Sequence, residues 1–224
     1  MNEQKKYEFT GEIKVVFGIN FKQIRAIINF GCVVAGEIGG WIECEENLSQ
    51  SGNAWVSGDA RVSGNARVSG DARVSGNAEV YGNAEVSGNA RVSGNAWVSG
   101  GARVSGNAEV SGNARVYGNA WVSGGARVYG NAWVSGNARV SGNADVKKGD
   151  DYMVIGGTGR YNRFTTFFKC RDKTIKVICG CFFGTIIEFR AKVKETHKGN
   201  KHEKVYLAMA DMAELQIGND EVEK

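Results

Sequence analysis

The chain has 224 residues, with 32 glycines, no proline and a formal net charge of +4. Collagen needs glycine at every third residue together with abundant proline, so this composition excludes a collagen-like fold. The longest apolar runs, 24–30 and 176–185, are too short to cross a bilayer, and no apolar segment follows the polar N-terminus. Five cysteines, an odd number, argue against a disulfide framework. We therefore expect a soluble, cytoplasmic protein with no membrane partner.

The N-terminal residues 1–35 contain three strand-like runs, Tyr7–Phe9, Ile13–Phe17 and Ile24–Phe30. These runs predict a small β unit in the first 35 residues.

From residue 52 to residue 146 the sequence repeats every six residues. Valine occupies every sixth position from 56 to 146, alanine from 54 to 144 and glycine from 52 to 142, with sixteen copies of each. A Val and an Ala two residues apart point to the same side of an extended chain, so they face an interior while the residue between them faces water. Each hexad predicts one short strand followed by a corner at Gly-Asn, Gly-Asp or Gly-Gly.

The period extends backwards in weaker form. Ile38 and Cys44 fall in the valine phase, while Ile42 and Leu48 fall in the alanine phase. We therefore expect the first coil to begin near residue 36. Because an open solenoid end exposes apolar surface and strand edges, residues 1–35 are predicted to form an N-terminal β cap.

The repeat, written Val-Ser-Gly-Asn-Ala-Arg from Val62 to Arg67, resembles the hexapeptide-repeat family over residues 53–146. The resemblance implies a left-handed parallel β-helix of triangular section with three hexads per coil. Gly39–Glu43 and Glu46–Ser49 resemble the lead-in of uncharacterised members encoded by bacteria, prophages and phages. The predicted organisation is a β cap (1–35), an all-β solenoid (36–147) and a C-terminal α+β module (148–224).

Outward residues eighteen apart should stack in a three-sided coil, about 4.8 Å apart. The first face then carries Trp55, Arg73, Arg91, Glu109, Arg127 and Asp145; the second Arg61, Glu79, Trp97, Arg115 and Trp133; the third Arg67, Glu85, Arg103, Trp121 and Arg139. Opposite charges and Trp–Arg pairs alternate along these columns, a pattern that fits a solvated face made self-complementary for stability. Asn holds the corner position in twelve of the sixteen hexads, which predicts stacked amides with a structural role.

The tryptophans also favour an interface. Trp97, Arg115 and Trp133 share one face, and Trp121 lies near the edge of the next, although arginine or glutamate would serve as well in water. Hexapeptide-repeat proteins commonly assemble as trimers, so this face and the resemblance together predict a homo-oligomer, a trimer or a dimer.

Acyl transfer is the enzymatic alternative. Acyltransferases of the hexapeptide-repeat family bind an acyl-coenzyme A between subunits and use a histidine base, but the repeat segment contains no histidine. The two histidines, His197 and His202, lie beyond it. No Ser-His-Asp or Cys-His signature is present, so we predict no catalytic residues and no cofactor.

The period ends after Val146, and the composition changes. Strands are predicted at Tyr152–Ile155, Phe164–Cys170 and Thr174–Cys179, followed by a helix that starts at the Thr185 capping box and ends near Thr196. A second helix is expected over 202–217. Its predicted buried stripe is Val205, Ala208, Met209, Met212 and Leu215. The runs from Cys179 to Thr185 and from Lys192 to His197, with Glu188 and Phe189, resemble the C-terminal end of the same phage-type proteins.

Two weaker motifs occur in this module. Cys170, Cys179 and Cys181 with His197 or His202 have the residue types of a zinc site but not the paired spacing, so no metal is predicted and packing is the preferred role. The glycine-rich run 156–159 precedes a strand rather than a helix, so a turn is expected there instead of a phosphate loop.

Positive charge gathers in the same module, because residues 160–204 hold twelve Lys or Arg against four acidic residues. Interleaved aromatic side chains make the composition typical of nucleic-acid or nucleotide binding, with solvation of a basic surface as the alternative. The candidate anion-binding residues are Arg160, Arg163, Lys169, Arg171, Lys173, Lys176, Lys192 and Lys194.

The sequence thus favours a non-enzymatic, phage-type scaffold that acts by binding another macromolecule, for example a host protein, with inhibition of a host defence system as one form of that role. Binding of nucleic acid or a nucleotide by the basic module is the first alternative, and acyl transfer is the second.

Overall fold

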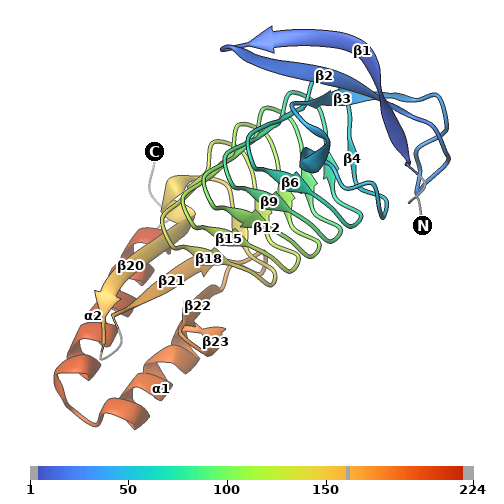
Figure 1. Cartoon of the computed structure of the whole chain (residues 1–224). Helices are drawn as coiled ribbons and strands as arrows, with labels where there is room; N and C mark the ends of the chain where they lie inside the picture. The colour runs from blue at the N-terminus through green and yellow to red at the C-terminus, as the bar shows by residue number, and fades with distance from the viewer. Residues whose placement is uncertain (1–4, 160–161, 219–224) are drawn as a thin grey trace, which may run out of the picture.

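The computed structural model describes residues 5–159 and 162–218 and shows a three-sided parallel β-solenoid with a β-hairpin at one end and an α+β module at the other (Figure 1). The predicted fold class, a β-solenoid with a small C-terminal α+β module, is confirmed. None of the helices in this described part of the chain is long and apolar enough to span a membrane.

Three stacks of strands form the solenoid, and all of these strands except β3 are two residues long. Face 1 contains β4 (Trp55–Val56), β7 (Arg73–Val74), β10 (Arg91–Val92), β13 (Glu109–Val110), β16 (Arg127–Val128) and β19 (Asp145–Val146). Face 2 contains β3 (Ile38–Ile42), β5 (Arg61–Val62), β8 (Glu79–Val80), β11 (Trp97–Val98), β14 (Arg115–Val116) and β17 (Trp133–Val134). Face 3 contains β6 (Arg67–Val68), β9 (Glu85–Val86), β12 (Arg103–Val104), β15 (Trp121–Val122) and β18 (Arg139–Val140).

The hexad dictates this architecture. The repeated valines from Val56 to Val146 and alanines from Ala54 to Ala144 are buried, and they form one continuous core. Corner glycines adopt the left-handed backbone that lacks a steric penalty only for glycine; Gly94, for example, has φ +69°. A Cβ on Gly94 would lie 3.0 Å from the backbone nitrogen of Gly112, so the stacked corners also leave no room for a side chain. Strands eighteen residues apart pair in parallel, as predicted.

The predicted amide stacks are also present. Asn77, Asn95, Asn113 and Asn131 form a chain of hydrogen bonds along one corner, each 3.1 Å long. Asn65–Asn83 and Asn89–Asn107 pair in the same way at the other two corners.

The N-terminal unit is a hairpin that extends the sheet of face 2. Strand β1 (Tyr7–Val16) pairs with β2 (Ile19–Ala26), and β2 pairs antiparallel with β3. The runs predicted at Tyr7–Phe9 and Ile13–Phe17 therefore belong to one strand, and the strand predicted at Ile24–Phe30 ends earlier, at Ala26. The 3-10 helix η1 (Glu45–Asn47) follows β3.

The phase predicted for the first coil is wrong. Ile42 pairs with Val62 and Leu48 with Val68, so these two residues stand in the valine columns and are fully buried. Ile38 is exposed and Cys44 is half-buried, outside those columns. The separation of Ile42 from Val62 is two residues longer than the period of eighteen, so the chain makes a wider connection before Ala54.

Trp55 also departs from the prediction, because it is buried rather than displayed on face 1. The rings of Tyr7 and Phe30 cover it, with centroids 6.5 and 5.4 Å from that of Trp55. The N-terminal unit therefore covers the first outward position of this face.

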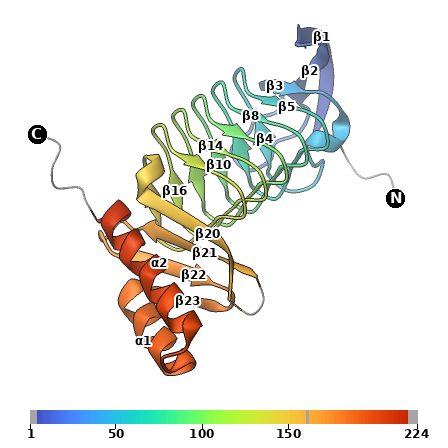
Figure 2. The ribbon, with the colours of Figure 1, turned by 90° about the vertical axis from the view of Figure 1, so that its left-hand side faces the viewer.

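The C-terminal module is a four-stranded antiparallel sheet with two helices on one side (Figure 2). After the 3-10 helix η2 (Gly149–Asp151) come β20 (Tyr152–Thr158), β21 (Arg163–Lys169), β22 (Ile175–Cys179), β23 (Phe182–Thr185), α1 (Ile186–His197) and α2 (Lys201–Ile217). Strand β23 was not predicted. The capping box is present, since the Thr185 hydroxyl accepts a hydrogen bond from the Glu188 amide at 3.2 Å and the Glu188 carboxylate accepts one from the Thr185 amide at 2.7 Å.

Strand β21 joins the module to the solenoid. Because neighbouring side chains on a strand point to opposite sides, Phe168 packs into the solenoid core while Phe167 packs under the helices. The backbones of Cys170 and Ala144 form an isolated antiparallel β-bridge. The Thr166 hydroxyl accepts a 3.0 Å hydrogen bond from the Arg139 amide. The module thereby closes the C-terminal end of the solenoid.

The buried face predicted for the second helix is displaced by about one residue. The buried residues of α2 are Tyr206, Met209, Ala210, Ala213 and Ile217, and only Met209 belongs to the predicted stripe. Ala208, Met212 and Leu215 are exposed. On the other flank of α2, Asp211 and Glu214 both pair with Arg190 of α1 at 2.6 Å, an arrangement consistent with this rotation.

Candidate binding surfaces

Face 2 carries the predicted column of aromatic and basic side chains. The guanidinium carbon of Arg115 lies 4.5 Å from the ring centroid of Trp97 and 4.9 Å from that of Trp133. Trp97 and Trp133 nevertheless remain 36% and 50% exposed. Together with Tyr81 and Tyr117 these residues line a shallow hollow of about 230 Å³, and we call this set the aromatic face.

The N-terminal hairpin extends the apolar surface. A second hollow, of about 270 Å³, is lined by the hairpin residues Val16 and Phe17 and, among others, by Tyr81 and Trp97 of the aromatic face. Phe17 lies at the tip, is 96% exposed and adopts φ +51°. A bulky residue in the left-handed region is strained, and such strain persists where something else favours the residue.

Trp121 belongs to a different surface. It stands on face 3, where Arg103 and Arg139 lie above and below its ring at 5.3 and 5.2 Å. The structure therefore does not place Trp121 beside Trp97 and Trp133, which line the aromatic face.

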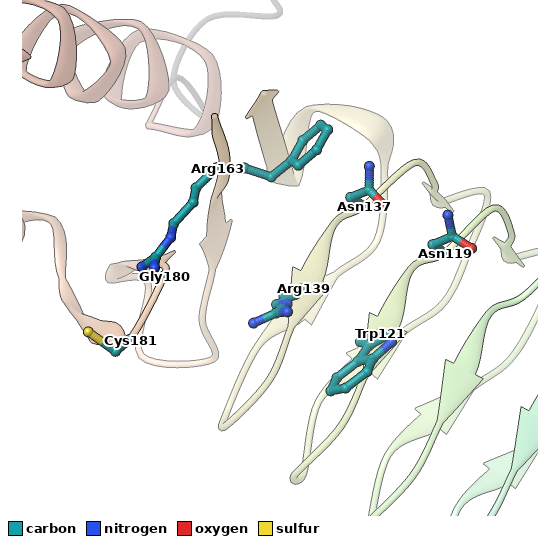
Figure 3. A pocket seen from close by; sticks show the side chains of 8 residues that line it. Asn119, Trp121, Asn137, Arg139, Arg163, Gly180 and Cys181 are labelled. Atoms are coloured by element: carbon teal, nitrogen blue, oxygen red, sulfur yellow. The ribbon is translucent and has the colours of Figure 1, made fainter. Parts of the chain in front are cut away.

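Trp121 contributes instead to the groove between face 3 and the C-terminal module, which we call the junction groove (Figure 3). The groove has a volume of about 640 Å³. It is lined by Asn119, Trp121, Asn137 and Arg139 of the solenoid and by Arg163, Phe164, Gly180 and Cys181 of the module. In Figure 3 the long side chains of Arg139 and Arg163 extend from the two sides of the junction.

The anion-binding candidates do not form one patch. Arg160 lies outside the described residues, and only Arg163 lines the junction groove. Lys169 lines a separate hollow beside Lys147 and Lys148, in which Asp145 and Asp151 supply opposite charge.

Other candidates have structural contacts. Arg171 donates a hydrogen bond to the carbonyl of Gly125, and Lys176 donates one to the Asn143 side chain at 3.1 Å, so both connect the module to the solenoid. Lys173 occupies the turn between β21 and β22.

Lys192 and Lys194 lie on α1. Lys192 pairs with Glu195 at 2.9 Å, and Lys194 is exposed. The basic residues that lie close together in the sequence of residues 160–204 are therefore spread over several parts of the module surface.

The cysteines and histidines considered for a zinc site lie in two places. Cys170 is buried in the solenoid core, where burial raises the pKa of its thiol. Cys179, Cys181 and His197 line a largely apolar cavity of about 480 Å³ beneath α1. Within residues 5–159 and 162–218, no group of three or more His, Cys, Asp or Glu side chains is arranged to hold a metal ion.

Comparison with known proteins supports the repeat. A family model described as the YdcK beta solenoid repeat matches residues 60–76, 84–100, 108–124 and 126–142. The repeats are similar to that family. The four matched segments all lie in the solenoid and cover less than a third of the chain, and no curated protein matches the sequence.

The sequence did not indicate the junction groove. Of its eight lining residues, Trp121 was singled out as an interface residue, Arg163 as an anion ligand and Cys181 as a possible zinc ligand. Asn119, Asn137 and Arg139 are ordinary repeat positions, and Gly180 carried no distinguishing signal. Phe164 belongs to the aromatic residues interleaved with the basic ones, most of which were expected to build the core of the module.

Proposed function

We propose that this protein is a non-enzymatic β-solenoid scaffold that binds another protein through the aromatic face. The observation that carries the proposal is the exposure of Trp97 and Trp133 around a central Arg115. Tryptophan, tyrosine and arginine dominate the energetics of protein interfaces, and an aromatic side chain held in place loses little entropy on binding.

The hairpin tip supports the same conclusion. Phe17 continues the apolar surface beyond Trp97 and is both strained and solvent-exposed, a combination that costs stability in the isolated chain. A partner that covered Phe17 and the two tryptophans together would offset that cost. Burial in the core selects only the inward residues of the repeat. Stacking on Arg115 gives the outward tryptophans a role within the chain, but it leaves Trp97 and Trp133 36% and 50% exposed.

The partner is either a second copy of the chain, as in a dimer or trimer, or a different protein. A cytoplasmic, phage-encoded protein that binds and inhibits a host defence protein is one specific form of the second case.

The test compares the wild-type protein with Trp97→Ser/Trp133→Ser and with Trp121→Ser. Light scattering reports self-association of the 24.1 kDa chain, and affinity capture from bacterial lysate reports other partners. Each substituted side chain points outward, so the folded core is retained, and Trp121→Ser controls for the loss of a tryptophan flanked by arginine.

We expect the double variant to lose self-association or a specific captured protein, and Trp121→Ser to keep it. A wild-type monomer near 24.1 kDa whose captured proteins are the same as those of the double variant would overturn the proposal.

A further inference from the structure

The junction groove has the composition of an anion site. Two guanidinium groups, from Arg139 and Arg163, and two primary amides, from Asn119 and Asn137, line it together with the rings of Trp121 and Phe164. No carboxylate is among the described residues that line it. A negatively charged ligand would therefore meet attraction and no acidic repulsion.

The amides show that the groove departs from the rest of the solenoid. Six pairs of asparagines follow one another directly in the corner columns, and five of these pairs are joined by a side-chain hydrogen bond of 3.0–3.1 Å. In the part of the chain that the structure describes, Asn119 and Asn137 form the one such pair without that bond. Both amides keep donors and acceptors for something else.

The arginines are pre-positioned from opposite walls. Arg139 stacks on the ring of Trp121, which orders its guanidinium before any ligand arrives. Arg163 lies against Gly180, where a side chain would collide with its guanidinium. Glycine at that position is therefore needed for Arg163 to keep this place at the wall of the groove.

An aromatic surface completes the site. Phe164 is 44% exposed, and its ring lies against Gly156, which has no side chain to displace it. Nucleobases stack on exposed aromatic rings, and amide side chains bind base edges by hydrogen bonds. The volume of about 640 Å³ lies in the range typical of small-molecule sites.

We propose that the junction groove binds a nucleoside phosphate, with the phosphates on Arg139 and Arg163, the base against Phe164 and the base edge at Asn119 and Asn137. The ligand is either a free nucleotide or a nucleotide of a single strand, since both present this chemistry. The site lies on face 3 and is independent of the protein-binding role proposed for the aromatic face.

Calorimetric titration of the full chain at low salt tests the proposal with adenosine, guanosine, cytidine and uridine triphosphates, with pyrophosphate and with a short single-stranded oligonucleotide. Arg139→Gln is the informative variant, and Arg91→Gln on face 1 is the matched control because it removes the same charge from an exposed strand position. Asn137→Ala tests recognition of the base.

We expect at least one nucleotide to bind more tightly than pyrophosphate, and Arg139→Gln to weaken that binding roughly tenfold or more, as loss of a charge-assisted hydrogen bond does. Arg91→Gln should leave the affinity unchanged, and Asn137→Ala should weaken nucleotide but not pyrophosphate binding. Tighter binding of the oligonucleotide with the same loss in Arg139→Gln would identify a strand as the source of the nucleotide.

Three results would overturn the proposal. One is the absence of saturable binding at millimolar nucleotide in low salt. The second is equal affinity for pyrophosphate and all nucleotides, which would leave no role for Phe164 and the amides. The third is equal weakening by Arg139→Gln and Arg91→Gln, which would reduce the effect to net charge.

Discussion

Lys6 is a buried lysine whose titration should be visible in the stability of the protein. Its side chain is 1% exposed, and its ammonium group donates hydrogen bonds to the carbonyls of Ala54, Gly52 and Ser51 at 2.8, 3.3 and 3.5 Å. It also lies 5.0 Å from the centroid of the Phe30 ring. Burial lowers the pKa of Lys6 from 10.5 to about 8, and the negative charge of Asp71 opposes this shift.

The direction of the effect follows from proton binding. Between pH 8 and pH 10.5 the unfolded chain keeps a proton on Lys6 that the folded chain releases. Unfolding therefore takes up a proton, and the free energy of unfolding rises with pH in this window. A pKa lowered by this amount corresponds to about 3 kcal/mol in total, of which about 2 kcal/mol is regained between pH 7 and pH 9.5.

Lys6→Met removes the titrating group while keeping most of the buried chain length. We expect the wild-type free energy of unfolding, measured by denaturant titration, to gain about 2 kcal/mol relative to Lys6→Met between pH 7 and pH 9.5. The difference between the two proteins is the measured quantity, because burial raises the pKa values of the Cys44 and Cys170 thiols and their ionisation lowers stability as pH rises. Burial also raises the pKa of Tyr7 above its ordinary value of 10.0, so the unfolded chain ionises this tyrosine first and stability falls only near and above pH 10, beyond the pH 9.5 limit of the measurement.

Parallel pH profiles for wild type and Lys6→Met would refute this reasoning. They would mean that the three carbonyls and Asp71 stabilise the ammonium group as well as water does.

Two further predictions compare matched substitutions. Met209→Ala should lower the free energy of unfolding by about 3 kcal/mol, because Met209 is buried. Met212→Ala should lower it by less than about 0.5 kcal/mol, because Met212 is exposed. Denaturant titration measures both costs, and a larger cost for Met212→Ala would contradict the observed rotation of α2. Asn95→Ala breaks two amide hydrogen bonds of 3.1 Å and should cost about 1 kcal/mol. Among the described residues the Asn119 side chain makes no hydrogen bond, so Asn119→Ala should cost less than half as much. Equal thermal shifts for the two alanine variants would show that the amide chain adds nothing to stability.

The solenoid could be predicted in detail because a single physical rule is applied sixteen times. Burial of Val and Ala fixes which side of each strand faces inward, and the period of eighteen then fixes every outward neighbour. The resemblance to the hexapeptide-repeat family implied three hexads per coil, and with that coil length the pairing of Trp97 with Arg115 and of Arg115 with Trp133 follows.

The first coil could not be predicted in the same way. Ile38, Ile42, Cys44 and Leu48 are all apolar, so both phases satisfy the alternation of a short strand. The longer connection before Ala54 decides between them, and it is fixed by contacts with the N-terminal unit, including the hydrogen bonds from Lys6 to Ser51 and Gly52. The rotation of α2 could not be predicted for a related reason. Alanine is only weakly apolar, so the sequence does not show that Ala210 and Ala213 are buried by a neighbouring element that packs closely against them.

In a uniform repeat, what is specific to this chain lies in departures from the repeat. The inward columns are identical from coil to coil, so they cannot distinguish one surface from another. Tryptophan on face 2 is a departure that the sequence itself shows. The stacked pair of Asn119 and Asn137, which lacks the side-chain hydrogen bond, is a departure that only the structure shows. Stacked asparagine pairs in other coils, such as Asn113 and Asn131, make that hydrogen bond. The C-terminal module packs against face 3 beside this pair and supplies Arg163 and Phe164. The binding groups of the junction groove therefore come from the solenoid and the module together.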